Sequence, residues 1–174
     1  MPGWLKWALL SLWALSLLAG MLLYSQRQLT DFDPSLALSQ AAASPTFDAA
    51  FVELLKDNGV KPGSIVHLQS DAGCYCNQLT APHKRQLSAR LGENYQLKQI
   101  SLDASPALQN LITAFPAVAI VDKQGVLRYL GPYATGYGCF TGATLVDFIA
   151  RAATATTSPG AIINAQATGC FCQT

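Results

Sequence analysis

Two cysteines separated by one residue, Cys74 and Cys76, lie between a stretch with the pattern of a strand and a stretch with the pattern of a helix. The apolar run Ile65 to Leu68 before them is typical of a buried strand, and the segment Gln78 to Leu91 after them has the apolar spacing of a helix. This order places the pair at a strand-to-helix turn, where the N–H groups at the start of a helix favour the thiolate, the reactive form of cysteine. The pair therefore indicates a chemical role more than a packing role.

The chain contains five cysteines, an odd number that cannot all be paired within one chain. They are Cys74, Cys76, Cys139, Cys170 and Cys172. At least one thiol is therefore free, paired with another molecule or bound as a ligand. The middle of the chain has enough Leu, Ile, Val and Phe to bury a core without cross-links, so we expect the cysteines to be chemical rather than structural.

The charges of the chain do not point to an electrostatic partner. The 174 residues carry 11 Lys and Arg against 10 Asp and Glu, with no basic cluster, so we expect no nucleic-acid partner. The length fits one domain of ordinary size together with an appendage.

The segment Trp7 to Tyr24 contains no charged residue and would span roughly 27 Å as a helix, close to the hydrocarbon thickness of a bilayer. A cleaved signal peptide is the alternative, but a small-x-small cleavage site is missing near its end, and Met21 stands where a lipidated cysteine would be. Lys6 and the amino terminus precede the segment, while Arg27 after it is followed by Asp31 and Asp33, which favours a cytoplasmic N-terminus. We therefore expect an uncleaved membrane anchor, with the soluble part in the periplasm or outside the cell.

Composition divides the chain into four parts. The stretch Ser39 to Pro45 has three alanines and no apolar face long enough to pack, which is typical of a spacer, although it could instead begin the first helix of the domain. The predicted parts are an anchor at 1–27, a linker at 28–43, a folded domain at 44–155 and a cysteine-containing tail at 156–174.

The residue patterns of the folded domain predict a leading helix and then the order β-α-β-α-β-β-α, in which the first two strands are parallel and the last two form a hairpin. Ser44-Pro45 begins the leading helix and Asn58-Gly59 ends it. The strands are expected at 64–69, 95–102, 117–121 and 126–130, and the later helices at 79–91, at 106–112 and around 145–149.

This order resembles the thioredoxin fold, in which a redox motif ends the first core strand, a proline interrupts the next helix, and a cis-proline opens the strand that faces the motif. The matching positions are Cys74 to Asn77, Ala81-Pro82 and Phe115-Pro116. The resemblance implies an α/β thioredoxin-like fold with a cis bond before Pro116, and substrate peptide bound by the backbone at Phe115 and Pro116. It also aligns His67 with a buried acid, which makes His67 a possible proton acceptor.

A closer resemblance rests on Cys-x-Cys-Asn, Pro82-His83, Gly131-Pro132-Tyr133 and a C-terminal Gly-Cys-Phe-Cys at 169–172. Together these phrases are similar to an uncharacterised family of membrane-anchored bacterial thioredoxin-like proteins. The resemblance implies a protein of the bacterial inner membrane with its soluble domain in the periplasm, and it supplies no mechanism. His83 itself is expected on the helix surface.

Thiol-disulfide exchange is the function that we expect from these cysteines. Cys74 would attack a disulfide of a protein partner, and Cys76 or Cys139 would resolve the mixed disulfide, with no cofactor. A bond between Cys74 and Cys76 requires a strained turn, so pairing with Cys139 or with the tail could replace it. The loop that holds Cys139 borders the redox motif in thioredoxin-like folds, and the tail is flexible enough to bring Cys170 and Cys172 to the same edge.

Two other functions remain open. The pairs Cys74 with Cys76 and Cys170 with Cys172 could together bind a metal, since one-residue spacing suits Cu(I) and two such pairs could enclose Zn(II) tetrahedrally. Alternatively, Cys170 and Cys172 only fasten the tail by structural disulfides, and the domain is a non-catalytic interaction module. Tyr75, beside the first pair, is not expected to be catalytic.

Overall fold

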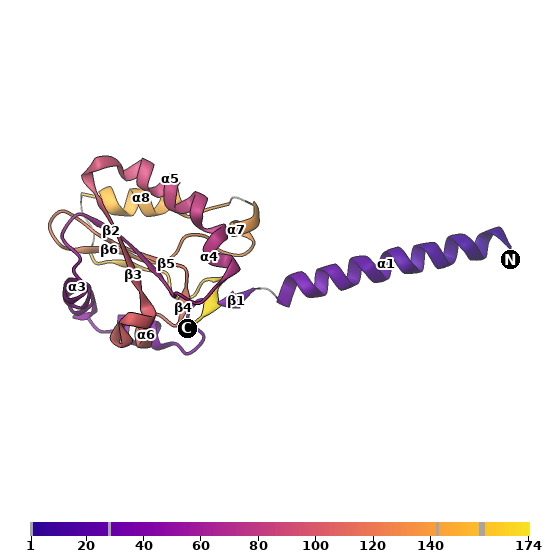
Figure 1. Ribbon diagram of the computed structural model, residues 1–174, viewed down its shortest axis with the longest axis horizontal. Coiled ribbons are helices and arrows are strands. Elements are labelled where there is room, and N and C mark those ends of the chain that lie inside the picture. Colours follow the sequence, from indigo (N-terminus) through magenta and orange to yellow (C-terminus); the bar gives the residue numbers. More distant parts are fainter. Residues whose placement is uncertain (1, 28, 142, 157–158) are drawn as a thin grey trace.

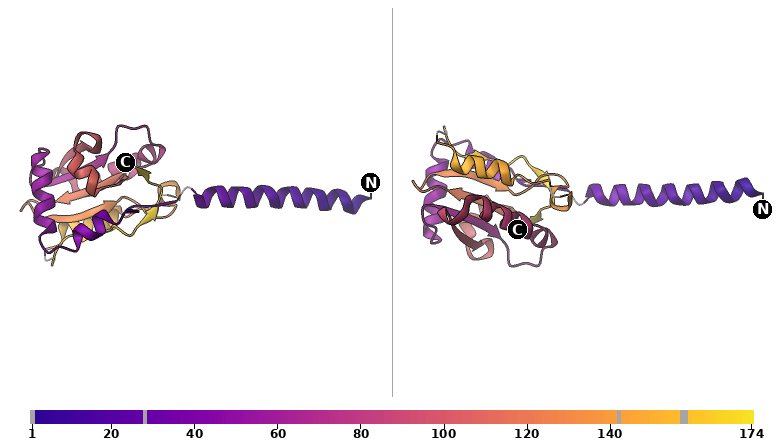
Figure 2. Two further views of the ribbon diagram at one scale, coloured as in Figure 1. Left: turned by 90° about the horizontal axis from the view of Figure 1, so that it is seen from below. Right: turned by 90° about the horizontal axis from the view of Figure 1, so that it is seen from above.

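A five-stranded mixed sheet lies at the centre of the folded part of the chain, with helices on both of its faces (Figure 1 and Figure 2). The structure is a computed structural model that describes residues 2–27, 29–141, 143–156 and 159–174. The helices are α1 (Gly3–Arg27), α2 (Ala37–Ala42), α3 (Phe47–Asp57), α4 (Tyr75–Leu79), α5 (Ala81–Leu91), α6 (Pro106–Leu111), α7 (Gly138–Thr141) and α8 (Val146–Thr154), with short 3-10 turns at Gly92–Asn94 and Leu102–Ala104. The strands are β1 (Thr30–Asp31), β2 (Ser64–Gln69), β3 (Gln96–Ser101), β4 (Ala114–Phe115), β5 (Ala117–Val121), β6 (Leu127–Pro132), β7 (Ile162–Ile163), β8 (Thr168–Gly169) and β9 (Cys172–Gln173).

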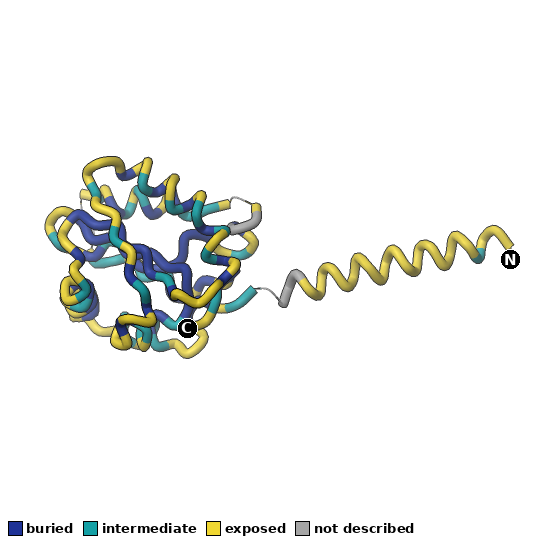
Figure 3. The backbone as a smooth tube through the Cα atoms, viewed as in Figure 1, coloured by how far each residue is buried: buried dark blue, intermediate teal, exposed yellow. Residues whose placement is uncertain are grey.

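Helix α1 projects away from the rest of the molecule and is exposed along almost its whole length (Figure 3). Its segment Gly3–Tyr24 has 22 residues, and the most apolar 18-residue window within it has a mean hydropathy of 1.8 and is 0% buried inside the protein. This length and composition allow the helix to cross a membrane, as the sequence predicts. A signal sequence would have the same features.

The strands of the central sheet follow the order β3-β2-β5-β6-β7. β2 pairs in parallel with β3, with Ile65 opposite Leu97, because the chain returns through α4 and α5 before it enters β3. β5 pairs antiparallel with both β2 and β6. The turn between β5 and β6 is closed by Asp122, whose Oδ1 accepts the N–H groups of Gln124 and Val126 at 2.9 Å each. The predicted mixed α/β arrangement is therefore confirmed.

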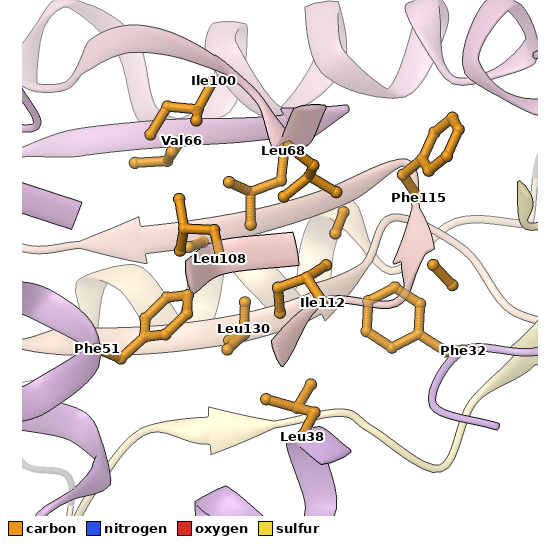
Figure 4. Close-up of a cluster of buried hydrophobic side chains, with 14 of the residues drawn as sticks. Phe32, Leu38, Phe51, Val66, Leu68, Ile100, Leu108, Ile112, Phe115 and Leu130 are labelled. Atoms are coloured by element: carbon orange, nitrogen blue, oxygen red, sulfur yellow. The ribbon is translucent and has the colours of Figure 1, made fainter. Parts of the chain in front are cut away.

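Each face of the sheet is covered by its own hydrophobic core. Successive residues of a strand point to opposite faces, so Val66 and Leu68 of β2 pack with residues of α2, α3 and α6 (Figure 4), whereas Ile65 packs with residues of α5 and α8. Each fully buried Leu, Ile or Phe side chain contributes roughly 1.5–3 kcal/mol to stability. The two cores make the sheet a rigid support for the cysteines that follow β2.

The segment between α1 and α3 belongs to the folded domain, unlike the predicted linker at 28–43. Phe32 and Leu38 are each 1% exposed and lie in the core beside α3 (Figure 4). Asp33 fixes the turn before α2, since its carboxylate accepts the N–H groups of Leu38 at 3.2 Å and of Ser39 at 2.7 Å. The two apolar side chains are too far apart in the sequence to form a periodic pattern, and composition alone therefore indicates a spacer.

The C-terminal tail is also folded onto the domain rather than flexible. β7 pairs in parallel with β6, β8 pairs antiparallel with β1, and β9 pairs antiparallel with β4, where the yellow end of the chain lies in Figure 1. Ala167, Cys170 and Phe171 are buried. These strands have two residues each, which is too short for the alternation of apolar and polar residues that predicts a strand from sequence. Gln28 and residues 157–158, in the predicted linker and tail, lie outside the described residues.

Candidate thiol-disulfide site

Two disulfides join the start of α4 to the C-terminal tail, one from Cys74 just before the helix and one from Cys76 in its first turn. Cys74 is bonded to Cys172 and Cys76 to Cys170, with Cα–Cα distances of 6.4 and 5.8 Å. The two Cys-x-Cys segments therefore run in opposite directions, and the Cys76–Cys170 bond lies inside the loop that the Cys74–Cys172 bond closes. Cys74 is thus bonded to a cysteine of the tail. This is one of the two pairings that the sequence allows in place of a strained bond between Cys74 and Cys76.

The turn that carries Cys74 is held by the segment after β3. The hydroxyl group of Ser70 and the N–H group of Asp71 both donate to Oδ2 of Asp103, at 2.8 and 2.7 Å. Helix α4 begins at the residue after Cys74, and the N–H group of Asn77 donates to the carbonyl group of Cys74 at 3.2 Å. These contacts hold the first Cys-x-Cys segment at the strand-to-helix turn that the sequence predicts.

The second Cys-x-Cys segment is held by strand pairing on both sides. Before it, β8 pairs antiparallel with β1. After it, β9 pairs antiparallel with β4, with Cys172 opposite Phe115, and the N–H group of Thr174 donates to the carbonyl group of Thr113 at 3.0 Å. The backbone of the tail is therefore fixed by hydrogen bonds as well as by sulfur.

Phe171, between the two tail cysteines, inserts into the core. Its side chain is 6% exposed and packs edge-on against Phe32, with ring centroids 5.2 Å apart and ring planes at 70°. Its carbonyl group accepts a hydrogen bond from the hydroxyl group of Thr30 at 3.1 Å. Tyr75, at the matching position of the first Cys-x-Cys segment, is instead 64% exposed. The place of the tail therefore depends on packing in addition to the disulfides.

The sulfur atoms of the two disulfides lie close enough for one bond to react with the other. The Sγ atoms of Cys74, Cys76 and Cys172 all lie within 4.8 Å of one another. Cys74 is 7% exposed and Cys170 is 3% exposed, whereas Cys172 is only half-buried. Cys172 is therefore the cysteine of this cluster at which a thiol from solution can arrive.

The predicted substrate-binding pair, Phe115 and Pro116, lies beside the disulfides. The peptide bond between the two residues is cis, as predicted. Both residues are buried, and β9 with Cys172 is paired along β4. In this oxidised form the backbone at Phe115 is paired with the tail of the same chain, and binding of a substrate peptide at this place stays a prediction.

His67 lies on the face of β2 opposite the core that contains the cysteines. Its two neighbours in β2 belong to the hydrophobic cluster that contains Cys74, whereas Nδ1 of His67 shares a hydrogen bond with the hydroxyl group of Tyr133 on the other face. Burial and, after it, the positive charge of Lys84 lower the pKa of His67 from 6.5 to about 4. The imidazole is therefore neutral at pH 7, and its role as proton acceptor stays a prediction.

Three polar side chains that were not predicted as part of the site connect β2 to the helices α4 and α5. Nζ of Lys84 donates to Oε1 of Gln69 at 2.9 Å and to Oδ1 of Asn77 at 3.3 Å. Burial lowers the pKa of Lys84. Asn77 and Lys84 are seven positions apart, which is two turns of a helix. This spacing is the sequence signal that could have predicted their contact.

The prediction that His83 lies on the helix surface was wrong. His83 is 3% exposed, and among the described residues neither of its ring nitrogens has a hydrogen-bond partner. Burial lowers its pKa. His83 shares one face of α5 with the buried Leu87 and Leu91, which follow it by one and two turns. That spacing is the signal for a buried position.

Cys139, predicted as a resolving cysteine, is part of α7, which lies beside α4 (Figure 1). Its side chain lies outside the described residues, so its pairing stays a prediction. The other four cysteines, which the sequence also suggests as a metal-binding set, are brought together by the two disulfides; they are Cys74, Cys76, Cys170 and Cys172.

In a comparison with protein families, residues 43–174 match the family described as Domain of unknown function (DUF6436). The match includes both Cys-x-Cys segments and strands β2, β4, β8 and β9, whereas β1 precedes it. Comparisons with curated proteins and with solved structures gave no match. Since the family model covers most of the chain, the protein belongs to the DUF6436 family.

Proposed function

We propose that the protein is a membrane-anchored thiol-disulfide oxidoreductase that exchanges disulfides with a protein partner in the periplasm. The observation that supports this most is the gathering of the Sγ atoms of Cys74, Cys76 and Cys172 within 4.8 Å of one another, across two disulfides. A second disulfide adds little to the holding of the tail, because the long loop is already closed by the first. With its sulfur within 4.8 Å of the first disulfide, however, the second disulfide can exchange with it.

The order of the strands supports a thioredoxin-like fold for the domain. The parallel pair of β2 and β3 and the antiparallel pairing of β5 with β2 and β6 follow the predicted order, and the cysteines come directly after β2. The apolar helix α1, with Lys6 and the amino terminus before its charge-free segment and Arg27, followed by Asp31 and Asp33, after it, supports an anchor in the bacterial inner membrane with the domain in the periplasm.

Exchange begins at the bond between Cys74 and Cys172, because Cys172 is the more exposed of the two. A thiolate of a reduced protein partner attacks Sγ of Cys172, the disulfide breaks, and Cys74 leaves as a thiolate. A second thiol of the partner loses its proton, attacks the partner's sulfur in the mixed disulfide and releases Cys172. The partner leaves with a disulfide, and Cys74 and Cys172 keep two electrons and take up two protons.

The second disulfide extends this capacity. A thiolate on Cys172 lies within 4.8 Å of Sγ of Cys76, so it can attack that sulfur and release Cys170 as a thiolate. The disulfide thereby moves from the buried Cys170 to the half-buried Cys172, where a second partner can reduce it. The four cysteines together accept four electrons, and no cofactor takes part because the partner's thiols supply the electrons.

Reduction of the full chain in detergent micelles, in glutathione or dithiothreitol buffers with a chelator and without denaturant, tests this function. Samples are quenched with acid, alkylated and mapped by mass spectrometry. We expect the Cys74–Cys172 bond to open first and the Cys76–Cys170 bond to follow. In the double variant Cys74→Ser with Cys172→Ser, the remaining bond should be reduced at least about tenfold more slowly, because its neighbouring thiolate is gone.

The matched control is the double variant Cys76→Ser with Cys170→Ser, in which the outer bond is still open to the partner. Its Cys74–Cys172 bond should be reduced within about twofold of the wild-type rate, because the first step needs only the outer pair. If both disulfides of the wild-type chain persist in excess dithiothreitol until denaturant is added, exchange is wrong, and an interaction module with structural disulfides is the better interpretation.

A further inference from the structure

The tail has contacts that do not depend on its disulfides. Phe171 packs against Phe32, and the N–H group of Phe32 donates to the carbonyl group of Ala167 at 2.8 Å. The N–H group of Thr174 donates to the carbonyl group of Thr113 at 3.0 Å at the other end of the tail. These contacts lie on both sides of the tail cysteines, so reduction of both disulfides leaves four thiols gathered in one place.

We propose that the fully reduced protein binds one Zn(II) ion through the thiolates of Cys74, Cys76, Cys170 and Cys172. Zinc binds cysteine sulfur at about 2.3 Å and prefers four ligands in a tetrahedron, which places the sulfurs about 3.8 Å apart. The Sγ atoms of Cys74, Cys76 and Cys172 already lie within 4.8 Å of one another. Sγ of Cys170 is not part of that group but is bonded to Cys76, so on reduction the bonded sulfurs must separate and Cys170 must move toward the other three.

Four thiolates are a donor set that selects the metal. Soft sulfur ligands in a tetrahedral arrangement favour Zn(II), whereas Mg(II), Ca(II) and Mn(II) prefer oxygen ligands. Cys74, Cys76 and Cys170 are largely shielded from water, which protects bound thiolates from oxidants in solution. The four sulfurs complete a tetrahedron, so neither His67 nor His83 is needed as a ligand.

Zinc binding and disulfide formation exclude each other at this site. A dithiol reductant gives two electrons and two protons to each disulfide and leaves as a disulfide itself. Zinc then displaces the four thiol protons and keeps its oxidation state. An oxidant that restores the two disulfides releases the ion, so the site alternates between an oxidised form with two disulfides and a reduced form with one zinc.

Cobalt(II) is the probe for this site, because it takes the same tetrahedral place as zinc and is coloured. The full chain in detergent micelles is reduced with a phosphine under argon and titrated with cobalt. We expect one ion per chain, with the strong d–d absorption of a tetrahedral site and thiolate-to-cobalt charge-transfer bands, and displacement by one equivalent of zinc. The oxidised chain should show neither absorption.

Cysteine variants test which sulfurs bind. The Cys139→Ser chain keeps only the four proposed ligands and should still bind one cobalt ion. Cys170→Ser and Cys172→Ser should each weaken binding at least about tenfold and change the charge-transfer bands, because one thiolate is lost. Hydrogen exchange at the N–H groups of Phe32 and Thr174 shows whether the tail of each reduced variant stays docked, which separates loss of a ligand from loss of the fold.

Absence of a tetrahedral cobalt spectrum in a reduced chain whose tail is docked overturns the zinc site, and so does a spectrum that survives both tail substitutions. If the reduced chain binds one Cu(I) ion and zinc does not compete for the site, the assignment of the metal as zinc is wrong. Exchange of the disulfides is measured with a chelator present, so a failure of the zinc site leaves the proposed oxidoreductase function intact, and the reverse also holds.

Discussion

Cys74 and Cys172 are 98 positions apart in the chain, and their Cα atoms lie 6.4 Å apart. The bond between Cys76 and Cys170 closes almost the same loop, over 94 positions. Once either bond is formed, the other closes only the short ring between the two Cys-x-Cys segments. The two disulfides therefore limit largely the same freedom of the unfolded chain.

We expect that loss of one disulfide costs little and loss of both costs much. Either pair of Cys→Ser substitutions should lower the free energy of unfolding by about 1–2 kcal/mol, and the chain without all four cysteines should lose about 5–6 kcal/mol, more than the sum of the two. Urea unfolding of the full chain in detergent micelles, followed by near-ultraviolet circular dichroism, measures these losses. Additive losses would contradict the shared-loop interpretation.

The aromatic residues of the two Cys-x-Cys segments should differ in their effect on stability. Phe171→Ala removes a ring that is 6% exposed and leaves a cavity beside Phe32, so we expect a loss of about 3–5 kcal/mol in the free energy of unfolding. Tyr75→Ala is the matched control, because Tyr75 is 64% exposed, and it should cost about 1 kcal/mol or less. Equal losses in urea unfolding would show that the tail is not held by Phe171.

His67 should make the protein less stable in acid. Burial and Lys84 lower the pKa of His67 from 6.5 to about 4, so below pH 6.5 the unfolded chain binds a proton that the folded chain does not. The contribution of His67 to the free energy of unfolding is therefore fully present above pH 6.5 and falls as the pH drops. Below about pH 4 the free energy of unfolding is lower by roughly 3 kcal/mol because of this residue.

The measurement is the free energy of unfolding of the wild-type and His67→Gln chains at a series of pH values from 7.5 to about 4. The difference in slope between the two chains isolates His67 from other groups, including His83, whose pKa burial also lowers. The variant should show the shallower decline. Parallel curves would mean that His67 takes up its proton as easily in the folded as in the unfolded chain.

The turn between β5 and β6 should depend on Asp122. Its carboxylate accepts two backbone N–H groups and the Nε–H group of Arg128 at 2.5 Å, and both side chains of this ion pair are largely buried. Asp122→Ala leaves the charge of Arg128 without its partner, so we expect a loss of about 3–5 kcal/mol. The neighbouring exposed substitution Lys123→Ala should change stability by less than about 0.5 kcal/mol in the same urea unfolding experiment.

The central sheet could be predicted because its strands carry local signals. The predicted strands 64–69 and 117–121 coincide with β2 and β5, since buried strands are continuous apolar runs bounded by turn residues. The turn at Cys74 and the cis bond before Pro116 were also predicted, the latter from a resemblance to a known fold. These features are decided within a few residues of the chain or by one family pattern.

The rest of the site could not be predicted because distant segments decide it. β1 pairs with β8 across most of the chain, and neither strand is long enough to show a pattern. Five cysteines allow many pairings, and their number says nothing about which tail cysteine meets Cys74. The buried place of Phe171 depends on Phe32, a residue in the predicted linker, so the sequence of the tail alone does not reveal it.

The pairing of β1 with β8 limits how far the cysteines can move from a bilayer. Thr30, in β1, lies opposite Gly169, next to Cys170, and only six positions after Tyr24, the end of the apolar segment of α1. Six residues reach at most about 20 Å when fully extended. When α1 crosses a membrane, the disulfides are therefore tethered close to the lipid headgroups, and a partner must bring its own sulfur to the membrane surface to meet them.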